Sequence, residues 1–345
     1  MAQINKSTDY FNTKLYTGNG STQSITGVGF QPDLIWTKGR SVAENHNAYD
    51  IVRGAGERLI PNGTNAETTQ TDTQTSFDSD GFTLGLNAEI NGSGATYASW
   101  NWLADNTSGS SNTDGSITST VSVNTTSGFS IVTYTGTGVS ETIGHGLGAV
   151  PNVIIVKGSS GTSAVDGWYT YHSSVGNTKF VELNNTGGAT TFSTMWDNTT
   201  PTTTTFSTTY LSKASTNYVA YCFAEKKGFS KFGGYTGNGS ADGTFVYTGF
   251  KPAFLLVKKS SASGSDWNLH DNKRPGFNVN NSYLAPNENA AEVTGNTYQI
   301  FDLLSNGFKC RGAGTGTNAS GETMIYMAFA ESPFVGNNFV PNNAR

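Results

Sequence analysis

Three blocks of sequence recur in the same order along this 345-residue chain, and this recurrence limits its possible folds more than any other feature. The first block is a Tyr-Thr-Gly-x-Gly motif that begins at Tyr16, Tyr134 and Tyr235. The second places a proline at Pro32, Pro151 and Pro252, with a lysine six residues later at Lys38, Lys157 and Lys258. The third is an aromatic segment at 97–102, 218–223 and 324–329. Self-similarity of this kind indicates duplication of one structural unit, so we expect three copies of roughly 100 residues.

Each second block indicates a strand. Proline is tolerated at the start of a strand, and the short apolar run after each proline is typical of a strand buried on both faces. The composition agrees, because 42 glycines and a 13% share of charged residues favour short strands joined by tight turns. The sequence therefore predicts an all-β protein, with three tandem antiparallel β-sandwich domains of jelly-roll or lectin-like form.

The repeats also predict domain boundaries. We expect repeat one at 1–106, a Ser/Thr/Gly linker with an additional strand at 107–127, repeat two at 128–227, repeat three at 228–334 and an extended tail at 335–345. Because the linker composition is typical of flexible segments, copy one is expected to move while copies two and three pack rigidly together.

Several functional classes lack their usual signals. A net charge of −5 without a basic block argues against nucleic acid, and no apolar run is long enough for membrane insertion. No apolar leader follows Met1, so synthesis in a cytoplasm without a signal peptide is expected. The two cysteines and four histidines show no metal spacing, and no nucleophile elbow or nucleotide-binding loop is present. We therefore expect no enzyme, no catalytic residue, no metal and no cofactor.

One group of side chains survives alignment of the copies and is the candidate ligand site. It combines an acidic or histidine position (Asp50, His172, Asp271), an arginine three residues later in two copies (Arg53, Arg274) and a ring four residues earlier (His46, Trp168, Trp267). One hypothesis is a shallow sugar site, in which a ring stacks on the sugar while Asp and Arg bind hydroxyls. The other is a salt bridge that pins a loop. Glu67 and Glu292 follow in two copies, so a glycosidase carboxylate pair is the most remote interpretation.

The longer motifs resemble a repeat-domain family of virion structural and fibre-like proteins of marine tailed phages, including cyanophages. The resemblance lies in Gly128-Phe-Ser-Ile-Val-Thr-Tyr-Thr-Gly-Thr-Gly138, Tyr218-Val-Ala-Tyr-Cys-Phe-Ala-Glu225, Phe245-Val-Tyr-Thr-Gly-Phe-Lys-Pro252 and Tyr326-Met-Ala-Phe-Ala-Glu331. It covers nearly the whole chain and implies a virion structural protein, but it brings no catalytic or binding residues with it.

The resemblance implies localisation in the virion and contacts with other tail or capsid proteins. We expect a tail- or head-fibre component that attaches to a host-surface polysaccharide. The alternatives are a purely structural capsid decoration or tail-assembly protein and, least favoured, a polysaccharide depolymerase. Copy one begins close to Met1, which leaves little room for a separate docking module; this strengthens the decoration alternative or implies that copy one itself docks. Homo-oligomerisation stays open, because the chain has no coiled-coil heptads.

Overall fold

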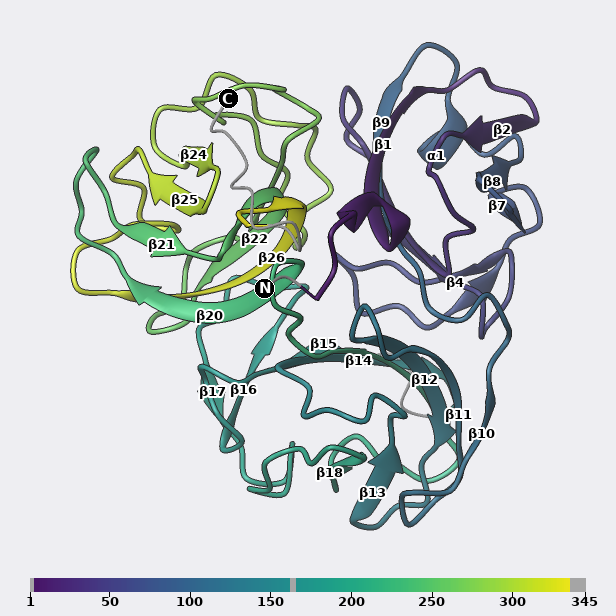
Figure 1. The fold of residues 1–345 in the computed structure, drawn as a ribbon. Coiled ribbons are helices and arrows are strands. Elements are labelled where there is room, and N and C mark those ends of the chain that lie inside the picture. Colours follow the sequence, from purple (N-terminus) through teal and green to yellow (C-terminus); the bar gives the residue numbers. More distant parts are fainter. Residues whose placement is uncertain (1–2, 162–165, 336–345) are drawn as a thin grey trace.

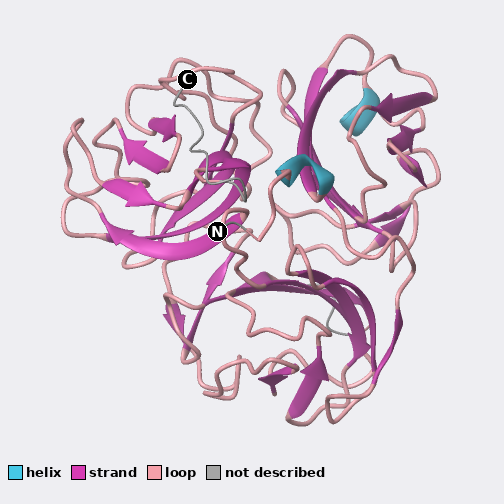
Figure 2. Ribbon diagram, viewed as in Figure 1, coloured by secondary structure: helices cyan, strands magenta, loops and turns pink. Residues whose placement is uncertain are grey.

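The computed structural model describes residues 3–161 and 166–335, and it consists almost entirely of strands and loops (Figure 2). Strands make up 43% of it and helices 2%. The helical elements are the 3-10 turn η1 (Ser7–Asp9) and the short helix α1 (Ala88–Asn91). All pairs between the named strands are antiparallel. The prediction of an all-β antiparallel protein is confirmed.

Copy one contains a larger and a smaller sheet. The larger has the order β1 (Phe11–Thr17), β9 (Thr96–Trp102), β3 (Leu34–Gly39) and β4 (Asn47–Asp50). The smaller has the order β2 (Gln23–Thr26), β8 (Gly81–Leu84) and β7 (Gln74–Asp78). A short pair, β5 (Glu57–Arg58) and β6 (Thr68–Thr69), lies in the connection between β4 and β7.

The other two copies repeat this plan. Copy two pairs β12 (Phe129–Thr135), β19 (Asn217–Phe223), β14 (Val153–Ser160) and β15 (Trp168–His172), with β13 (Glu141–Gly144) and β18 (Thr205–Thr208) as its smaller sheet. Copy three pairs β20 (Ser230–Thr236), β26 (Thr323–Pro333), β22 (Phe250–Lys259) and β23 (Asn268–Asp271), with β21 (Phe245–Tyr247), β25 (Gly307–Cys310) and β24 (Phe301–Leu304) as its smaller sheet. The duplicated blocks thus occupy matching strands.

The tyrosines of the first block have equivalent surroundings. Each lies on the first strand of its larger sheet, is buried, and donates its hydroxyl proton to a backbone carbonyl of its own copy. The acceptors are Ile90 for Tyr16, Leu211 for Tyr134 and Thr317 for Tyr235. A buried hydroxyl needs such a partner, so the recurrence of tyrosine reflects a recurring hydrogen bond.

The strand of the second block is buried on both faces, as predicted. All six residues of β3 and seven of the eight in β14 are buried. Pro32 and Pro151 precede their strands, whereas Pro252 lies inside β22 at a register shift. A bulge is one of the few places inside a sheet where proline fits, because no ladder hydrogen bond is lost there.

The three larger sheets face one another around a common centre, so that the copies form three lobes (Figure 1). The inward side chains form one hydrophobic cluster, rich in aromatic rings, that includes Trp36, Trp100 and Trp102 from copy one, Phe129, Tyr221 and Phe223 from copy two, and Phe254, Met327 and Phe329 from copy three. An apolar cavity of about 30 Å³ lies in this cluster, and side chains of all three copies line it. The outward faces of the larger sheets pack instead against the smaller sheets of their own copies.

The segment between copies one and two does not act as a free linker. It contains β10 (Ser110–Asn112) and β11 (Ser119–Asn124), which extend the larger sheet of copy two, while β16 (Lys179–Glu182) and β17 (Thr190–Thr191) extend the opposite edge. Copy one also contributes side chains to the central cluster. Copy one is therefore joined to the other copies by the central cluster as well as by the chain, which argues against the separate movement expected from the linker composition. Of the predicted tail at 335–345, residues 336–345 lie outside the described residues.

Candidate functional site

The eight sequence-predicted site residues lie between the copies and not at the outer surface. Seven of the eight residues are buried, and the eighth, Arg53, has a side chain that is only 5% exposed. A sugar cannot reach these side chains unless the copies separate. What the residues form is a set of contacts that repeats around the centre, which we call the interface ring.

At the first position of the ring, copy one contacts copy two through a buried ion pair. The Arg53 Nε donates to Asp50 Oδ2 at 2.6 Å, and Arg53 Nη1 donates to Glu67 Oε2 at 2.6 Å. Tyr221 of copy two donates its hydroxyl proton to Asp50 Oδ2 at 2.7 Å. Burial acts to lower the pKa of Arg53, but Asp50, Tyr221 and Glu67 together outweigh burial and raise that pKa. The guanidinium is thus held charged between two carboxylates.

The same contact recurs where copy three meets copy one. Arg274 Nε donates to Asp271 Oδ2 at 2.6 Å, and both side chains are 0% exposed. Trp100 of copy one donates its indole N–H to Asp271 Oδ2 at 3.1 Å. Arg274 also pairs with Glu292, which accepts a second bond from Arg40 of copy one at 2.8 Å. Burial acts to raise the pKa of Asp271, but Arg274 and two backbone N–H groups hold it below its usual value.

Between copies two and three, histidine replaces the acid. His172 Nε2 donates to the backbone oxygen of Tyr326 at 3.1 Å, and its Nδ1 accepts the N–H of Ser174 at 3.1 Å. Burial lowers the pKa of His172 to about 4, so its imidazole is neutral near pH 7. Copy two has no arginine three residues after His172, so a buried carboxylate here would have no ion-pair partner, whereas a neutral side chain needs none.

The predicted aromatic position supplies a second contact at every junction. Each ring lies 2.8–3.0 Å from a backbone oxygen of the neighbouring copy, and the three pairs are Trp168 with Ile60, Trp267 with Glu182 and His46 with Ala285. The three acceptors occupy equivalent positions. Each directly follows a residue that pairs with the last larger-sheet strand of its copy, namely Leu59, Val181 and Leu284. These rings bind protein backbone and do not present a face for stacking.

A backbone hydrogen bond completes each junction. The N–H groups of Glu67, Ala189 and Glu292 donate to the carbonyl oxygens of Ser159, Ser260 and Arg40, at 2.7–2.8 Å. Each acceptor lies two residues after the lysine of the second block. The contacts between copies one and two, two and three, and three and one are therefore versions of one interface.

The lysines of the second block belong to the same structure. Lys38, Lys157 and Lys258 are 0% exposed, and each ammonium donates to backbone carbonyl oxygens. Lys157 also reaches Thr64 of copy one at 3.3 Å, and Lys258 reaches Thr186 of copy two at 3.2 Å. Burial lowers the pKa of each lysine to about 8.

The ring therefore corresponds to the second sequence hypothesis, a salt bridge that holds a loop, with an added role between copies that the sequence did not indicate. Cys222 packs in the core of copy two, where burial raises the pKa of its thiol. Among residues 3–161 and 166–335, no three metal-ligating side chains gather, and no helix has the length and apolar character needed to cross a bilayer.

Sequence reasoning missed a groove on the outside of copy three, which we call the copy-three groove. It has a volume of about 510 Å³. Its lining residues are Lys251, Asn272, Lys273, Gly276, Phe277, Asn278, Asn280, Leu303 and Glu331. Phe277 is 75% exposed, more than any other large hydrophobic side chain in the described part of the chain. The loop that carries Phe277 is longer in copy three than in the other copies, but this difference is evident only once the strand pairing is known.

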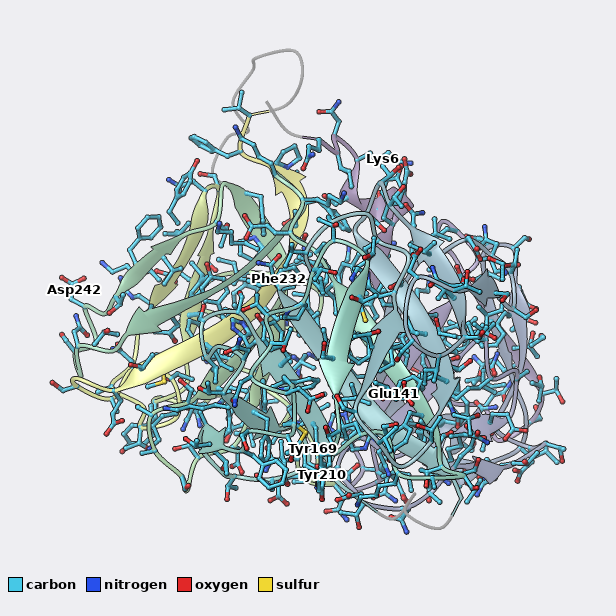
Figure 3. The ribbon with its side chains drawn as sticks, turned by 90° about the horizontal axis from the view of Figure 1, so that it is seen from below. Lys6, Glu141, Tyr169, Tyr210, Phe232 and Asp242 are labelled. Carbon is cyan, nitrogen blue, oxygen red and sulfur yellow. The ribbon has the colours of Figure 1, made fainter. Side chains whose placement is uncertain are left out.

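A second aromatic and charged cluster lies on copy two, where Tyr169 and Tyr210 lie side by side (Figure 3). Both hydroxyls donate to the Asp166 carboxylate, which also accepts the Lys213 ammonium at 3.0 Å. The Lys213 nitrogen lies 4.5 Å from the centre of the Tyr210 ring. Because these groups satisfy one another, the cluster offers fewer unpaired groups to a ligand than the copy-three groove does.

The family comparison covers the ring and all three lobes. A family described as "Domain of unknown function (DUF7483)" matches residues 6–333. The chain belongs to this family. The DUF7483 unit thus spans the three copies together and not one copy alone, in keeping with an interface ring that needs all three. No curated protein and no solved structure matches the chain.

Proposed function

We propose that this DUF7483 protein is a surface component of a phage virion, a tail- or head-fibre part that attaches to host-surface glycans. The proposal starts from the resemblance of its repeated motifs to virion proteins of tailed phages. One structural observation supports it: the ionisable and aromatic residues that recur in the copies are buried in contacts between the copies. What is left to act on other molecules is the outer loops.

A rigid body with variable outer loops suits attachment. Loops on a fixed scaffold can differ between copies without disturbing the core, and binding residues are often found there. Because a virion carries a surface protein many times, a weak site on each chain suffices, and multivalency raises the overall affinity by about 10²–10⁴. One shallow groove per chain is compatible with this requirement.

We also propose that each copy is a β-sandwich unit. In each copy a larger and a smaller sheet enclose their own hydrophobic cluster, such as Tyr16, Ile35, Phe82 and Tyr97 in copy one. The larger sheet, however, is covered on both faces, by the smaller sheet outside and by the other copies inside. Such a unit does not bury its inner face alone, which favours three units in one body over three independent sandwiches.

A capsid decoration or tail-assembly protein is the second candidate, and the shape favours it in one respect. The three lobes surround one centre, so the body is compact and is not an elongated shaft (Figure 1). A compact body suits the tip of a fibre or a cap on a capsid lattice. A depolymerase remains the least favoured candidate, since the recurring carboxylates Asp50 and Asp271 are buried in ion pairs.

Electron cryomicroscopy of the virion tests the proposal. Density for the three-lobed body at the tail tip or on head fibres is the expected result, together with adsorption to host cells that an antibody against the chain inhibits. Density on the capsid lattice with adsorption unaffected by the antibody supports decoration instead. Absence of the chain from purified virions contradicts both. Release of reducing ends from host polysaccharide by the purified chain would favour the depolymerase.

A further inference from the structure

The copy-three groove exists because copy three departs from the repeat. In copies one and two, the residue that pairs back across the strand comes nine positions after Asp50 or His172, at Leu59 and Val181. In copy three it is Leu284, thirteen positions after Asp271. Insertions in one repeat of a repeated fold often form a binding face, because the scaffold does not require them.

The inserted loop is fixed at both ends. At its start, the Asp271 carboxylate accepts the N–H groups of Lys273 and Arg274, both at 2.9 Å. At its end, Asn278 bonds to both backbone groups of Leu303, at 2.9 Å and 3.1 Å. Phe277 lies next to this second anchor, so the anchor sets the position of its backbone. A backbone position set in advance reduces the conformational freedom lost on binding.

The groups around the Phe277 ring define the chemistry of a ligand. Lys251 is paired with Glu331 at 2.8 Å, while no hydrogen bond or ion pair joins the Lys273 ammonium to another described residue. The groove thus carries two lysines and one carboxylate on a chain whose net charge is −5. Asn272 also lines the groove, and no hydrogen bond joins its side-chain N–H group to another described residue, so this group can donate to a hydroxyl.

We propose that the copy-three groove binds one unit of an acidic saccharide, a pyranose that carries a carboxylate or a sulfate. The apolar C–H face of the sugar packs on the Phe277 ring, its anionic group pairs with Lys273, and one of its hydroxyls accepts the side-chain N–H of Asn272. A neutral sugar would offer the Lys273 ammonium no ionic partner, and a flat hydrophobic ligand would offer the Asn272 amide no acceptor. This inference rests on the proposed attachment function and names the class of glycan.

Calorimetric titration of the full-length chain tests the site with three probes: oligogalacturonate for the carboxylate, sulfated dextran oligomers for the sulfate, and unsulfated dextran oligomers of the same length. We expect one acidic probe to bind at one site per chain, and Phe277→Ala and Lys273→Ala each to weaken it at least tenfold. Both residues are exposed, so neither change removes buried contacts.

Matched controls separate the groove from general effects. Tyr298→Ala removes another exposed aromatic ring of copy three, and Lys179→Ala removes an exposed charge of copy two. Both lie outside the groove and should leave the affinity unchanged. Equal binding of sulfated and unsulfated dextran, equal affinities of the Phe277→Ala chain and the parent, or no binding of either acidic probe would overturn the inference.

Virions that carry the variants separate this inference from the proposed function. If Phe277→Ala virions contain the protein and still adsorb to host cells, the groove is not the attachment site, although the surface role stands. If Phe277→Ala prevents incorporation into the virion while saccharide binding is unchanged, the groove docks a virion protein and the inference fails. If the unaltered chain is absent from virions, the proposed function itself fails.

Discussion

Replacing Phe82 by alanine tests whether the three copies unfold as one unit. Phe82 is 0% exposed and lies in the core of copy one, with its ring centre 6.2 Å from that of Tyr16. It does not belong to the central cluster. Truncating a buried Phe to Ala removes its transfer free energy and leaves a cavity, which together lower the free energy of unfolding by about 3–5 kcal/mol.

The interface ring determines where this loss is felt. Unfolding copy one alone would break two of the three junctions and would expose Phe223 and Phe329, whose rings pack within 6.3 Å of Trp102. We therefore expect that the copies open together and that Phe82→Ala lowers the stability of all three by the same amount. Hydrogen exchange measured by mass spectrometry checks this, because the slowest amides report global opening.

The readout is the protection of central strands outside copy one. In Phe82→Ala, the slowest amides of β19 and β26 should lose the same 3–5 kcal/mol of protection, about 2–4 factors of ten, as those of β9. Phe308→Ala is the matched variant in copy three, since the Phe308 ring packs on Tyr235 at 5.8 Å as Phe82 packs on Tyr16. If each variant changes only the amides of its own copy, the argument for a single cooperative body is refuted.

Three further changes test the ring itself. Tyr221→Phe removes the hydroxyl bonded to Asp50, so the free energy of unfolding in urea should fall by about 1.5–3 kcal/mol, and an unchanged value would show that the carboxylate does not need it. Because burial lowers the pKa of His172 to about 4, the unfolded chain takes up this proton first as pH falls, and stability present above about pH 6.5 should be lost towards pH 4. The free energy of unfolding should fall less steeply with decreasing pH in His172→Gln than in the parent. The difference between the two profiles isolates His172 from Asp33, whose burial raises its pKa to about 6 and so makes the folded chain more stable as pH falls. The buried lysines have a pKa of about 8, so the folded chain loses protons before the unfolded chain does, and stability should rise by about 1–2 kcal/mol between pH 7.5 and 8.5; a flat or falling profile contradicts this.

The sequence predicts well those features that recur within a copy. The spacing of Tyr16, Tyr134 and Tyr235 correctly places three equivalent strands, because each tyrosine satisfies the same local bond. A phenylalanine precedes the first block in every copy, but its place shifts: strand pairing sets Ser230 of copy three opposite Phe329, so Phe229 lies one position before the place that Phe11 and Phe129 occupy. An aromatic on either side of that position still reaches the central cluster.

Contacts between copies could not be predicted in the same way. The indole of Trp168 binds the backbone oxygen of Ile60, and backbone acceptors leave no signature in the side chain that carries them. The Asp271–Arg274 spacing indicated an ion pair, but nothing in the sequence indicates that Trp100 lies against it. The copy-three groove depends on counting residues between paired strands, which requires the pairing of Leu269 with Leu284 to be known.

The differences between copies show that each junction has its own matched pair. A head-to-tail contact that repeats with a threefold rotation closes on itself, and here the closure occurs within one chain. Asp50 accepts a hydrogen bond from the hydroxyl of Tyr221, and Asp271 accepts one from the indole N–H of Trp100. The residue of copy three that corresponds to Tyr221 and Trp100 is Met327, which has no proton to donate. A buried carboxylate that faced the thioether of Met327, with no arginine beside it, would lower the free energy of unfolding because its charge would be unpaired. The neutral His172 avoids that cost by donating to a backbone oxygen, so the acid is absent at the one junction that lacks a side-chain donor.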